Sequence, residues 1–237
     1  FTGGRDGTVR AWDTRAKPTP AASALPAGFF AVPVRPDGHL DDSVPFFALR
    51  SLSRDGRFLA ACSTNGLRRV LSLETLDQIG EVQSSRRFRC VSIRPDGREI
   101  AAGMTNGAVS VWDVVESKVS WTFQAHSNDV DVLEFSPDGG RLATASRGAE
   151  IRLWNRGESR PVFTRVLGGT VYHVNDMAFT HDGSTLAVPA SGKIHLLSLR
   201  PGGRDRKIDA DEIFCIDISR DGSLVAAGLN DGVRVWD

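Results

Sequence analysis

The chain has 237 residues, of which 41% are apolar, and its 29 Lys and Arg residues balance its 29 Asp and Glu residues. This length and apolar content are enough to bury a substantial core without disulfides or metal ions. The zero net charge excludes the broad positive field that draws nucleic acid or anionic membranes, and no apolar run approaches the roughly 18 residues of a membrane-spanning helix.

The first thirteen residues predict the last two strands of a sheet. Phe1–Gly4 and Thr8–Asp13 are β-prone segments that flank the turn Arg5-Asp6-Gly7. Residues 14–45 follow, with six prolines among small residues. Because proline removes donors from a strand ladder, we expect an extended surface loop there. The alternative is a pair of degenerate or duplicated strands around the corner Arg35-Pro36-Asp37-Gly38.

From residue 46 onward, a four-residue corner recurs five times. A polar residue opens each corner and Asp-Gly closes it, as in hairpin turns where glycine takes a positive φ. The corners are Ser53-Arg54-Asp55-Gly56, Arg94-Pro95-Asp96-Gly97, Ser136-Pro137-Asp138-Gly139, Thr180-His181-Asp182-Gly183 and Ser219-Arg220-Asp221-Gly222, and their glycines are 41, 42, 44 and 39 residues apart. Apolar, β-prone segments flank them, such as 88–93 and 100–102 around the second corner. Short strands at regular spacing predict an all-β repeat.

A second signal recurs in phase with the corners, about fifteen residues after each of them. Three repeats carry Val111-Trp112-Asp113, Leu153-Trp154-Asn155 and Val235-Trp236-Asp237, and Ala11-Trp12-Asp13 lies near the start. Leu71 and Leu197 stand at that place in the other two repeats. With both signals in phase, the chain closely resembles the WD40 family, over nearly its whole length outside residues 14–45.

The resemblance implies an all-β fold, a β-propeller of four-stranded antiparallel blades around a central channel. A single sheet of this size cannot bury its own apolar faces and must stack on its neighbours. We expect a partial blade at residues 1–13 and five full blades, each with its outer strand taken from the stretch just before it, at residues 46–72, 87–113, 130–155, 174–198 and 213–237. The chain is then an excerpt of a ring with six, seven or more blades.

The tryptophans are expected to be structural, with Trp12, Trp112, Trp154 and Trp236 filling the gaps between adjacent sheets. Leu71 and Leu197 lose ring area, so their blades should pack less tightly. In many repeats of this family a His, a Ser or Thr, an Asp and the Trp form a buried tetrad. Here His126, Thr144 and Trp154 match, but Gly148 stands where the Asp would be, and no repeat has all four residues. We therefore interpret His126 as a structural histidine and expect apolar stacking to carry most of the stability.

The sequence contains no catalytic, phosphate-binding or metal-binding motif, so we expect neither an enzyme nor a cofactor. His173 with Asp176, and His181 with Asp182, are interpreted as solvated polar residues rather than metal ligands. Cys62, Cys90 and Cys215 lie in apolar strands and give no disulfide framework. Buried free thiols favour a reducing compartment, and hence the cytoplasm.

The resemblance also implies where a partner docks. In WD40 propellers partners bind the face built by the loops that lead into the innermost strands, which we call the loop face. Transferred to this sequence, that face carries Phe46, Arg87, Arg89, Asp129, Asp131, His173, Asn175, Glu212 and Phe214. Arg and aromatic side chains often dominate binding. The alternative is that the arginines and aspartates pair with one another between neighbouring blades.

Three functions remain open. The first is a non-catalytic scaffold that holds a protein or peptide on the loop face, without nucleic acid, membrane or small-molecule substrate. The second is a sensory or regulatory module of a larger signalling kinase or NTPase, for example a bacterial one. The third is a propeller enzyme with a metal or cofactor in its channel.

Overall fold

The computed structural model describes residues 2–3, 9–10, 49–53, 56–62, 67–75, 77–83, 88–168, 174–229 and 232–237. The chain divides into two compact units, Phe1–Phe46 and Phe47–Asp237. In the first unit, β1 (Thr2–Gly3) pairs antiparallel with β2 (Val9–Arg10). The predicted loop at 14–45 and Trp12 lie outside the described residues. Within the described part of the chain, no helix is long and apolar enough to cross a membrane.

The second unit is built from five antiparallel sheets, four of them four-stranded. In chain order the sheets are β3 (Leu49–Leu52), β4 (Phe58–Cys62), β5 (Leu67–Ser72) and β6 (Gln78–Gln83); β7 (Phe88–Ile93), β8 (Glu99–Met104), β9 (Ala108–Asp113) and β10 (Lys118–Gln124); β11 (Val130–Phe135), β12 (Arg141–Ser146), β13 (Glu150–Asn155) and β14 (Pro161–Val166); β15 (Ala178–Phe179), β16 (Thr185–Ala190), β17 (Lys193–Ser198) and β18 (Arg206–Asp209); and β19 (Cys215–Ile218), β20 (Val225–Leu229) and β21 (Gly232–Trp236). The last sheet has three strands among the described residues. The expected all-β fold of four-stranded antiparallel blades is confirmed.

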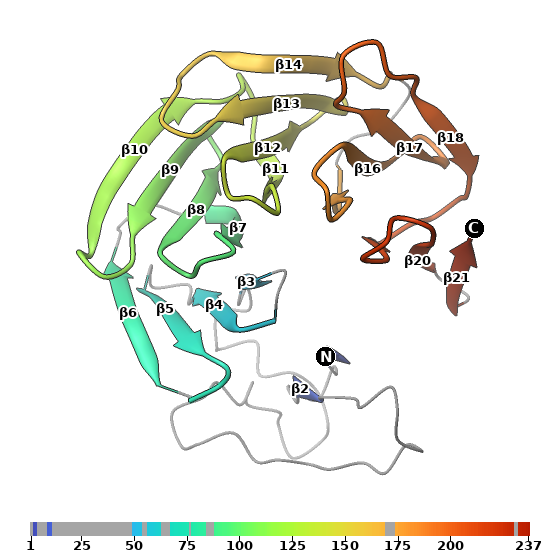
Figure 1. Ribbon diagram of the computed structural model, residues 1–237. Helices are drawn as coiled ribbons and strands as arrows, with labels where there is room; N and C mark the ends of the chain where they lie inside the picture. The colour runs from blue at the N-terminus through green and yellow to red at the C-terminus, as the bar shows by residue number, and fades with distance from the viewer. Residues whose placement is uncertain are drawn as a thin grey trace, which may run out of the picture. The chain divides into compact units, whose positions relative to one another are not determined.

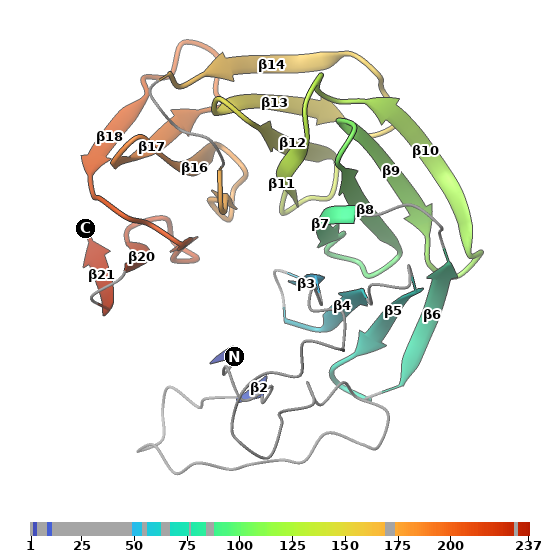
Figure 2. The same cartoon turned by 180° about the vertical axis from the view of Figure 1, so that it is seen from behind.

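The sheets of this unit fan about a common centre (Figures 1 and 2). Strands β3, β7 and β11 lie innermost, and β6, β10, β14 and β18 lie outermost. We call the side on which the innermost strands end, at the Asp-Gly corners, the corner face. The loop face is the opposite side, on which these strands begin.

The origin of the outer strands differs from the sequence expectation. Strand β6 pairs with β5 and β10 pairs with β9, so each outer strand comes from the stretch after the Trp position and not from the stretch before the blade. The reason is the tight turn that follows the third strand. At 114–117, for example, the Asp113 carboxylate accepts the backbone N–H groups of Val115 and Glu116. Such a short reversal leaves the next strand beside the one just finished.

The corners form the turns that the sequence predicted. At the third corner the Gly139 N–H donates to the Ser136 carbonyl over 2.8 Å, and the Ser136 hydroxyl oxygen accepts the Arg141 N–H over 2.9 Å. Gly139 has φ +67°, a conformation that glycine takes without steric cost. The Ser136 hydroxyl, which donates to the Asp138 carboxylate, is the main reason that the pKa of Asp138 lies below its usual value.

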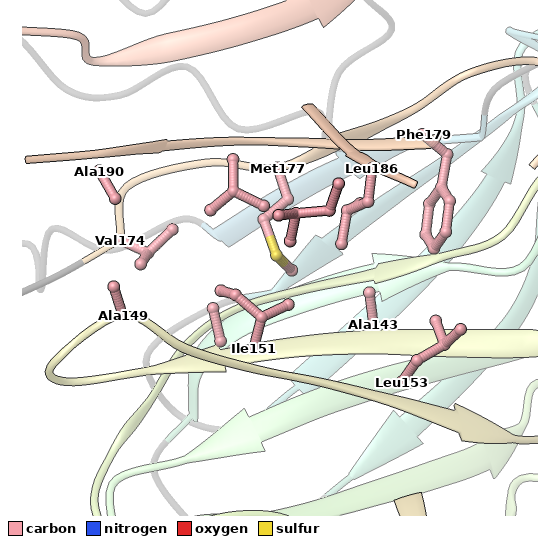
Figure 3. Close-up of a cluster of buried hydrophobic side chains, with 12 residues drawn as sticks. Ala143, Ala149, Ile151, Leu153, Val174, Met177, Phe179, Leu186 and Ala190 are labelled. Carbon is pink, nitrogen blue, oxygen red and sulfur yellow. The ribbon is translucent and has the colours of Figure 1, made fainter. Parts of the chain in front are cut away.

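The core lies between the sheets. Figure 3 shows one such layer, in which Ala143, Ile151 and Leu153 of one sheet pack against Met177 and Leu186 of the next. Leu197, at a Trp position, is fully buried in the same layer. Trp112 and Trp154 are also buried between sheets, whereas Trp236 is partly buried against β15–β18. Each fully buried Leu or Ile contributes about 1.5–3 kcal/mol, so these layers hold the sheets together.

Candidate functional site

On the loop face, Arg89 joins the start of β7 to the start of β11. Its Nε lies 2.9 Å from Oδ1 of Asp131, and its Nη1 lies 3.5 Å from Oδ2 of Asp129. Arg89 and Asp131 occupy the same repeat position, five residues before a corner, on two neighbouring innermost strands. The Asp131 side chain is 2% exposed, whereas that of Arg89 is 36% exposed. The inter-blade pairing therefore forms, and it leaves part of Arg89 accessible.

The same repeat position holds Asn175 and Phe214 farther along the chain. The Asn175 amide donates to the Ile213 carbonyl over 3.3 Å, which brings it beside Glu212 and Phe214 at the start of the next repeat. The Phe214 N–H donates to the Gly228 carbonyl, and Phe214 itself is 54% exposed. Glu212 is exposed and has φ +55°. The remaining predicted residues, Phe46, Arg87 and His173, lie outside the described residues.

The interpretation of Asp176 as a solvated polar residue is wrong, because both of its carboxylate oxygens accept backbone N–H groups at a largely buried position. Its Oδ2 accepts the Ile216 N–H over 2.9 Å, which links β19 to the segment that leads into β15, and its Oδ1 accepts the Met177 N–H. Burial raises the pKa of Asp176 to about 6, although the two backbone N–H groups oppose the shift. Similar links join other innermost strands, because Ser92 Oγ accepts the Phe135 N–H over 3.2 Å. The only signal in the sequence was a carboxylate in an otherwise apolar strand position.

The His126 network corrects the prediction that no repeat completes a tetrad. The His126 Nε2 lies 2.8 Å from Thr144 Oγ1, which also accepts the Trp154 Nε1–H over 2.9 Å. The fourth member is Glu150, whose Oε2 lies 3.1 Å from His126 Nδ1, and not the residue at Gly148. Glu150 is two residues farther along, at the start of β13, and its longer side chain reaches the ring. Burial lowers the pKa of His126, and the Glu150 carboxylate opposes this shift.

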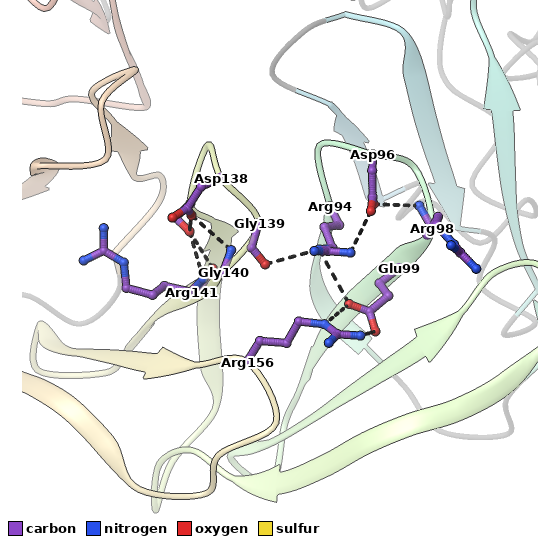
Figure 4. Close-up of polar contacts among 10 residues, drawn as sticks. Arg94, Asp96, Arg98, Glu99, Asp138, Gly139, Gly140, Arg141 and Arg156 are labelled. Atoms are coloured by element: carbon purple, nitrogen blue, oxygen red, sulfur yellow. Dashed lines mark hydrogen bonds and ion pairs between the residues drawn. The ribbon is translucent and has the colours of Figure 1, made fainter.

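Near the corner face, a buried carboxylate joins the second and third sheets (Figure 4). Glu99 is 4% exposed in its side chain, and both of its oxygens accept from Arg156, each over 2.7 Å. The Arg94 Nε lies 3.8 Å from the same carboxylate and also donates to the Gly139 carbonyl over 3.2 Å. This is a structural network, since two cations satisfy the one buried anion.

A cavity of about 800 Å³ opens at the centre of the corner face. Its lining includes the second residue of four corners and two carboxylates of the innermost strands: Pro95, Pro137, His181, Arg220, Glu134 and Asp217. His181 is thus exposed at this cavity, while the neighbouring Asp182 carboxylate accepts the Thr180 hydroxyl and pairs with Arg200. The cavity wall mixes both signs of charge.

The structure describes the side chains of two of the three cysteines, Cys90 and Cys215. Cys90 and Cys215 are free thiols, and Cys90 is buried. Burial raises the pKa of the Cys90 thiol far above its usual value, so it is chemically inert. Cys215 is exposed, which differs from the expectation that these thiols are buried.

The repeated sheets, the corners and the inter-sheet tryptophans define a protein of the β-propeller class. Three segments of the chain, residues 78–113, 117–155 and 206–237, match the WD40 family, described as "WD domain, G-beta repeat". These three segments of the chain are WD40 repeats, as the sequence resemblance predicted. Two of the matched segments begin at the first residue of an outer strand, β6 and β18, and continue into the next sheet. One sequence repeat therefore straddles two sheets.

Similar proteins carry the same repeats. The chain is 33% identical over 113 residues to the WD repeat-containing protein SL1-17 of Schistosoma mansoni, which covers 47% of this chain and 37% of that protein. It is 31% identical over 173 residues to a guanine nucleotide-binding protein subunit beta of Nicotiana tabacum, which covers 66% of this chain and 46% of that protein. The chain thus spans less than half the length of these relatives.

A solved structure supports the fold. The chain aligns with a chain of Kuenenia stuttgartiensis hydrazine synthase at a TM-score of 0.65, with 18% sequence identity, over 80% of this chain and 64% of that one. At this identity the likeness concerns the β-propeller fold alone.

Proposed function

We propose that this chain is a non-catalytic scaffold that holds a protein or peptide on its loop face. The observation that carries the proposal is Phe214, an aromatic side chain that is 54% exposed at the position of the repeat where β7 carries Arg89 and β11 carries Asp131. A half-exposed phenylalanine gains on binding because its ring leaves water, and aromatic side chains dominate many interfaces.

The neighbours of Phe214 supply the polar rim that such an anchor needs. Asn175 and Glu212 lie beside it, and the Asn175 amide is held by the Ile213 carbonyl. Arg89 and Asp129 form a second polar group on the same face, and the ion pair between them holds both side chains in place. A pre-formed ion pair costs little further ordering when a partner binds, and it orients the partner by charge. The two groups support a contact with a peptide or protein segment that carries an apolar side chain and flanking polar groups.

Two further points support a scaffold. The Nicotiana tabacum relative is by name a subunit of a guanine nucleotide-binding protein, and hence a component of a larger assembly. The polar networks around His126 and Glu99 hold strands and sheets together, and this structural use of their side chains supports a scaffold. A reducing, cytoplasmic location is part of the same proposal, because the three cysteines suggest no disulfide framework.

The test is affinity capture from the source cell with the chain as bait. Proteins retained by the wild type are identified by mass spectrometry, and the affinity of the purified partner is then measured directly. The Phe214→Ser variant is expected to weaken binding by about tenfold or more, as for an aromatic hot spot. Val162→Ser is the matched control, because Val162 is 52% exposed on the outer strand β14, away from the loop face. Equal affinities of the Phe214→Ser variant and the wild type would remove the loop face from the proposal.

A further inference from the structure

A small pocket rich in arginine lies on the corner face, at the turn between β17 and β18. It has a volume of about 310 Å³. Its lining includes three arginines and three residues with a hydroxyl group: Arg200, Arg204, Arg206, Ser184, Thr185 and Ser198. Thr185 pairs with Ser198 across β16 and β17, which places the end of β17 beside the corner Thr180–Gly183. The pocket is therefore on the side of the molecule opposite to Phe214.

The glycines of the turn make the pocket possible. Gly202 has φ +70°, which few other residues adopt without strain. The Gly203 N–H donates to the Arg200 carbonyl over 3.1 Å, and a side chain at Gly203 would collide with the Ser198 hydroxyl. The turn thus folds tightly over Ser198 and keeps Arg200 and Arg204 on the rim of one hollow.

The charges around the pocket leave an excess of cations. Arg200 pairs with Asp182 over 2.7 Å, and its side chain is still 68% exposed. Asp205, between Arg204 and Arg206 in sequence, is neutralised by a different arginine: it pairs with Arg165 over 3.1 Å and accepts the Ser198 N–H over 3.0 Å. Among the residues with described positions, Arg204 and Arg206 form no ion pair, and both are exposed. In a chain of zero net charge this is a local positive site.

We propose that this pocket binds the phosphate group of a phosphorylated serine or threonine in a partner protein. A phosphomonoester carries close to two negative charges at neutral pH and three acceptor oxygens, which match several forked guanidinium donors together with hydroxyl donors. A carboxylate has fewer acceptor oxygens and half the charge, so it would leave donors unused. Clusters of arginine that converge on one point are a recurrent means of recognising phosphorylated segments.

A protein ligand is favoured over a membrane surface by the surroundings of the pocket. The three arginines line one hollow formed by a single sheet and the turn between its last two strands. The central cavity on the same face mixes acidic with basic residues, so this face offers an anionic bilayer no broad positive surface. The proposal goes beyond the scaffold function of the loop face, since it adds a second contact on the other side of the propeller with its own chemical requirement.

The test uses the whole chain and three probes: the peptide Gly-Gly-Ser-Gly-Gly with a phosphorylated serine, the same peptide without phosphate, and vesicles of phosphatidylcholine with phosphatidylserine. Binding is followed by amide NMR shifts. We expect saturable shifts at Ser198 and Gly203 with the phosphopeptide, and an affinity at least about tenfold above that of the unphosphorylated peptide. The double substitution Arg204→Ser with Arg206→Ser should lower the phosphopeptide affinity by about tenfold or more.

The matched control is Arg147→Ser with Arg160→Ser, which removes the same charge from two exposed arginines outside the pocket. This control should keep the wild-type affinity within about twofold. The proposal is overturned by equal binding of the two peptides, by shifts that do not include Ser198 and Gly203, or by equal losses in the two double variants. Binding to the vesicles without binding to the phosphopeptide would assign the pocket to a lipid headgroup and would also overturn it.

Discussion

The carboxylate of Glu150 lies 3.1 Å from Nδ1 of His126 and completes a hydrogen-bonded network that ends at the Trp154 indole. The network crosses from the segment before β11 to β12 and β13, so one blade is braced from its loop-face turn to its inter-sheet tryptophan. Glu150 also accepts from Arg152 over 2.7 Å, and Arg152 in turn donates to the Ala125 carbonyl. The acid therefore holds both the ring and the chain that carries it.

Removal of this acid should destabilise the fold. Glu150→Ala leaves a buried His126 nitrogen without its partner, which costs about 1–3 kcal/mol in the free energy of unfolding. Urea unfolding followed by tryptophan fluorescence measures this change. Glu116→Ala is the control, because Glu116 only pairs with Lys118 at the exposed surface and should change stability by less than about 1 kcal/mol. Equal stabilities of the two variants would show that the network adds no stability.

The two classes of ion pair in this protein should differ in the same assay. Arg156→Ala removes the bidentate partner of the buried Glu99 carboxylate and leaves only Arg94 nearby, so we expect a loss of about 1–3 kcal/mol. Arg200→Ala breaks the exposed pair with Asp182 and should cost less than about 1 kcal/mol. A smaller loss for Arg156→Ala than for Arg200→Ala would contradict the role given to burial here.

Asp176 should make stability depend on pH. Burial raises the pKa of Asp176 to about 6, so the folded chain keeps a proton between about pH 4 and pH 6 that the unfolded chain has released. The contribution of this group is therefore most favourable below about pH 4 and is lost as the pH rises through 6.

Asp176→Asn removes this titration but retains an oxygen that accepts an N–H. Relative to the wild type, the variant should gain roughly 2–3 kcal/mol in unfolding free energy between pH 4 and pH 7. Urea titrations at several pH values measure the difference, in which the other carboxylates cancel. Asp211→Asn, at an exposed carboxylate, should give a flat difference. A flat difference for Asp176→Asn as well would place this carboxylate in contact with water.

Gly107 ties the turn between β8 and β9 to the strand that leads into the next sheet. It has φ +80°, and its carbonyl accepts the N–H groups of Ala125 and His126. A side chain at Gly107 would collide with the His126 carbonyl, whereas Gly168 has a similar φ with nothing near. Gly168→Ala should therefore cost about 1–2 kcal/mol from its backbone alone, and Gly107→Ala clearly more. Thermal unfolding compares the two, and equal midpoints would mean that the neighbouring chain moves aside.

Much of the fold could be predicted from the sequence because its signals are local. Asp-Gly fixes each corner, and the segments beside it alternate or run apolar, so strands such as β7 and β12 follow from their own residues. The source of the outer strands could not be predicted in this way. Val119 and Phe123 in β10 indicate a strand, but the apolar pattern does not say whether that strand joins the sheet before it or the sheet after it. The turn at 114–117, where Asp113 accepts the N–H groups of residues two and three positions later, is the local signal that the sequence analysis missed.

The candidate site was predicted in part. The repeat register placed Arg89, Asp131, Asn175 and Phe214 at one position, and the structure shows that Arg89 and Asp131 pair. The carboxylates with the largest structural roles were missed, because their partners are distant in sequence. Glu99 meets Arg156 across 57 residues, and Asp176 meets Ile216 across 40. Glu150 was missed because a fixed spacing pointed to Gly148, while a longer side chain reaches His126 from two residues away.

The straddling of two sheets by one sequence repeat affects how such a chain can grow or shrink. A segment of one period contains the outer strand of the preceding sheet and the three inner strands of the following sheet. When such a segment is duplicated or deleted, every remaining sheet still has all of its strands. A segment with the bounds of one sequence repeat can therefore be gained or lost as a unit. The number of sheets then changes, while each outer strand still pairs with the sheet before it.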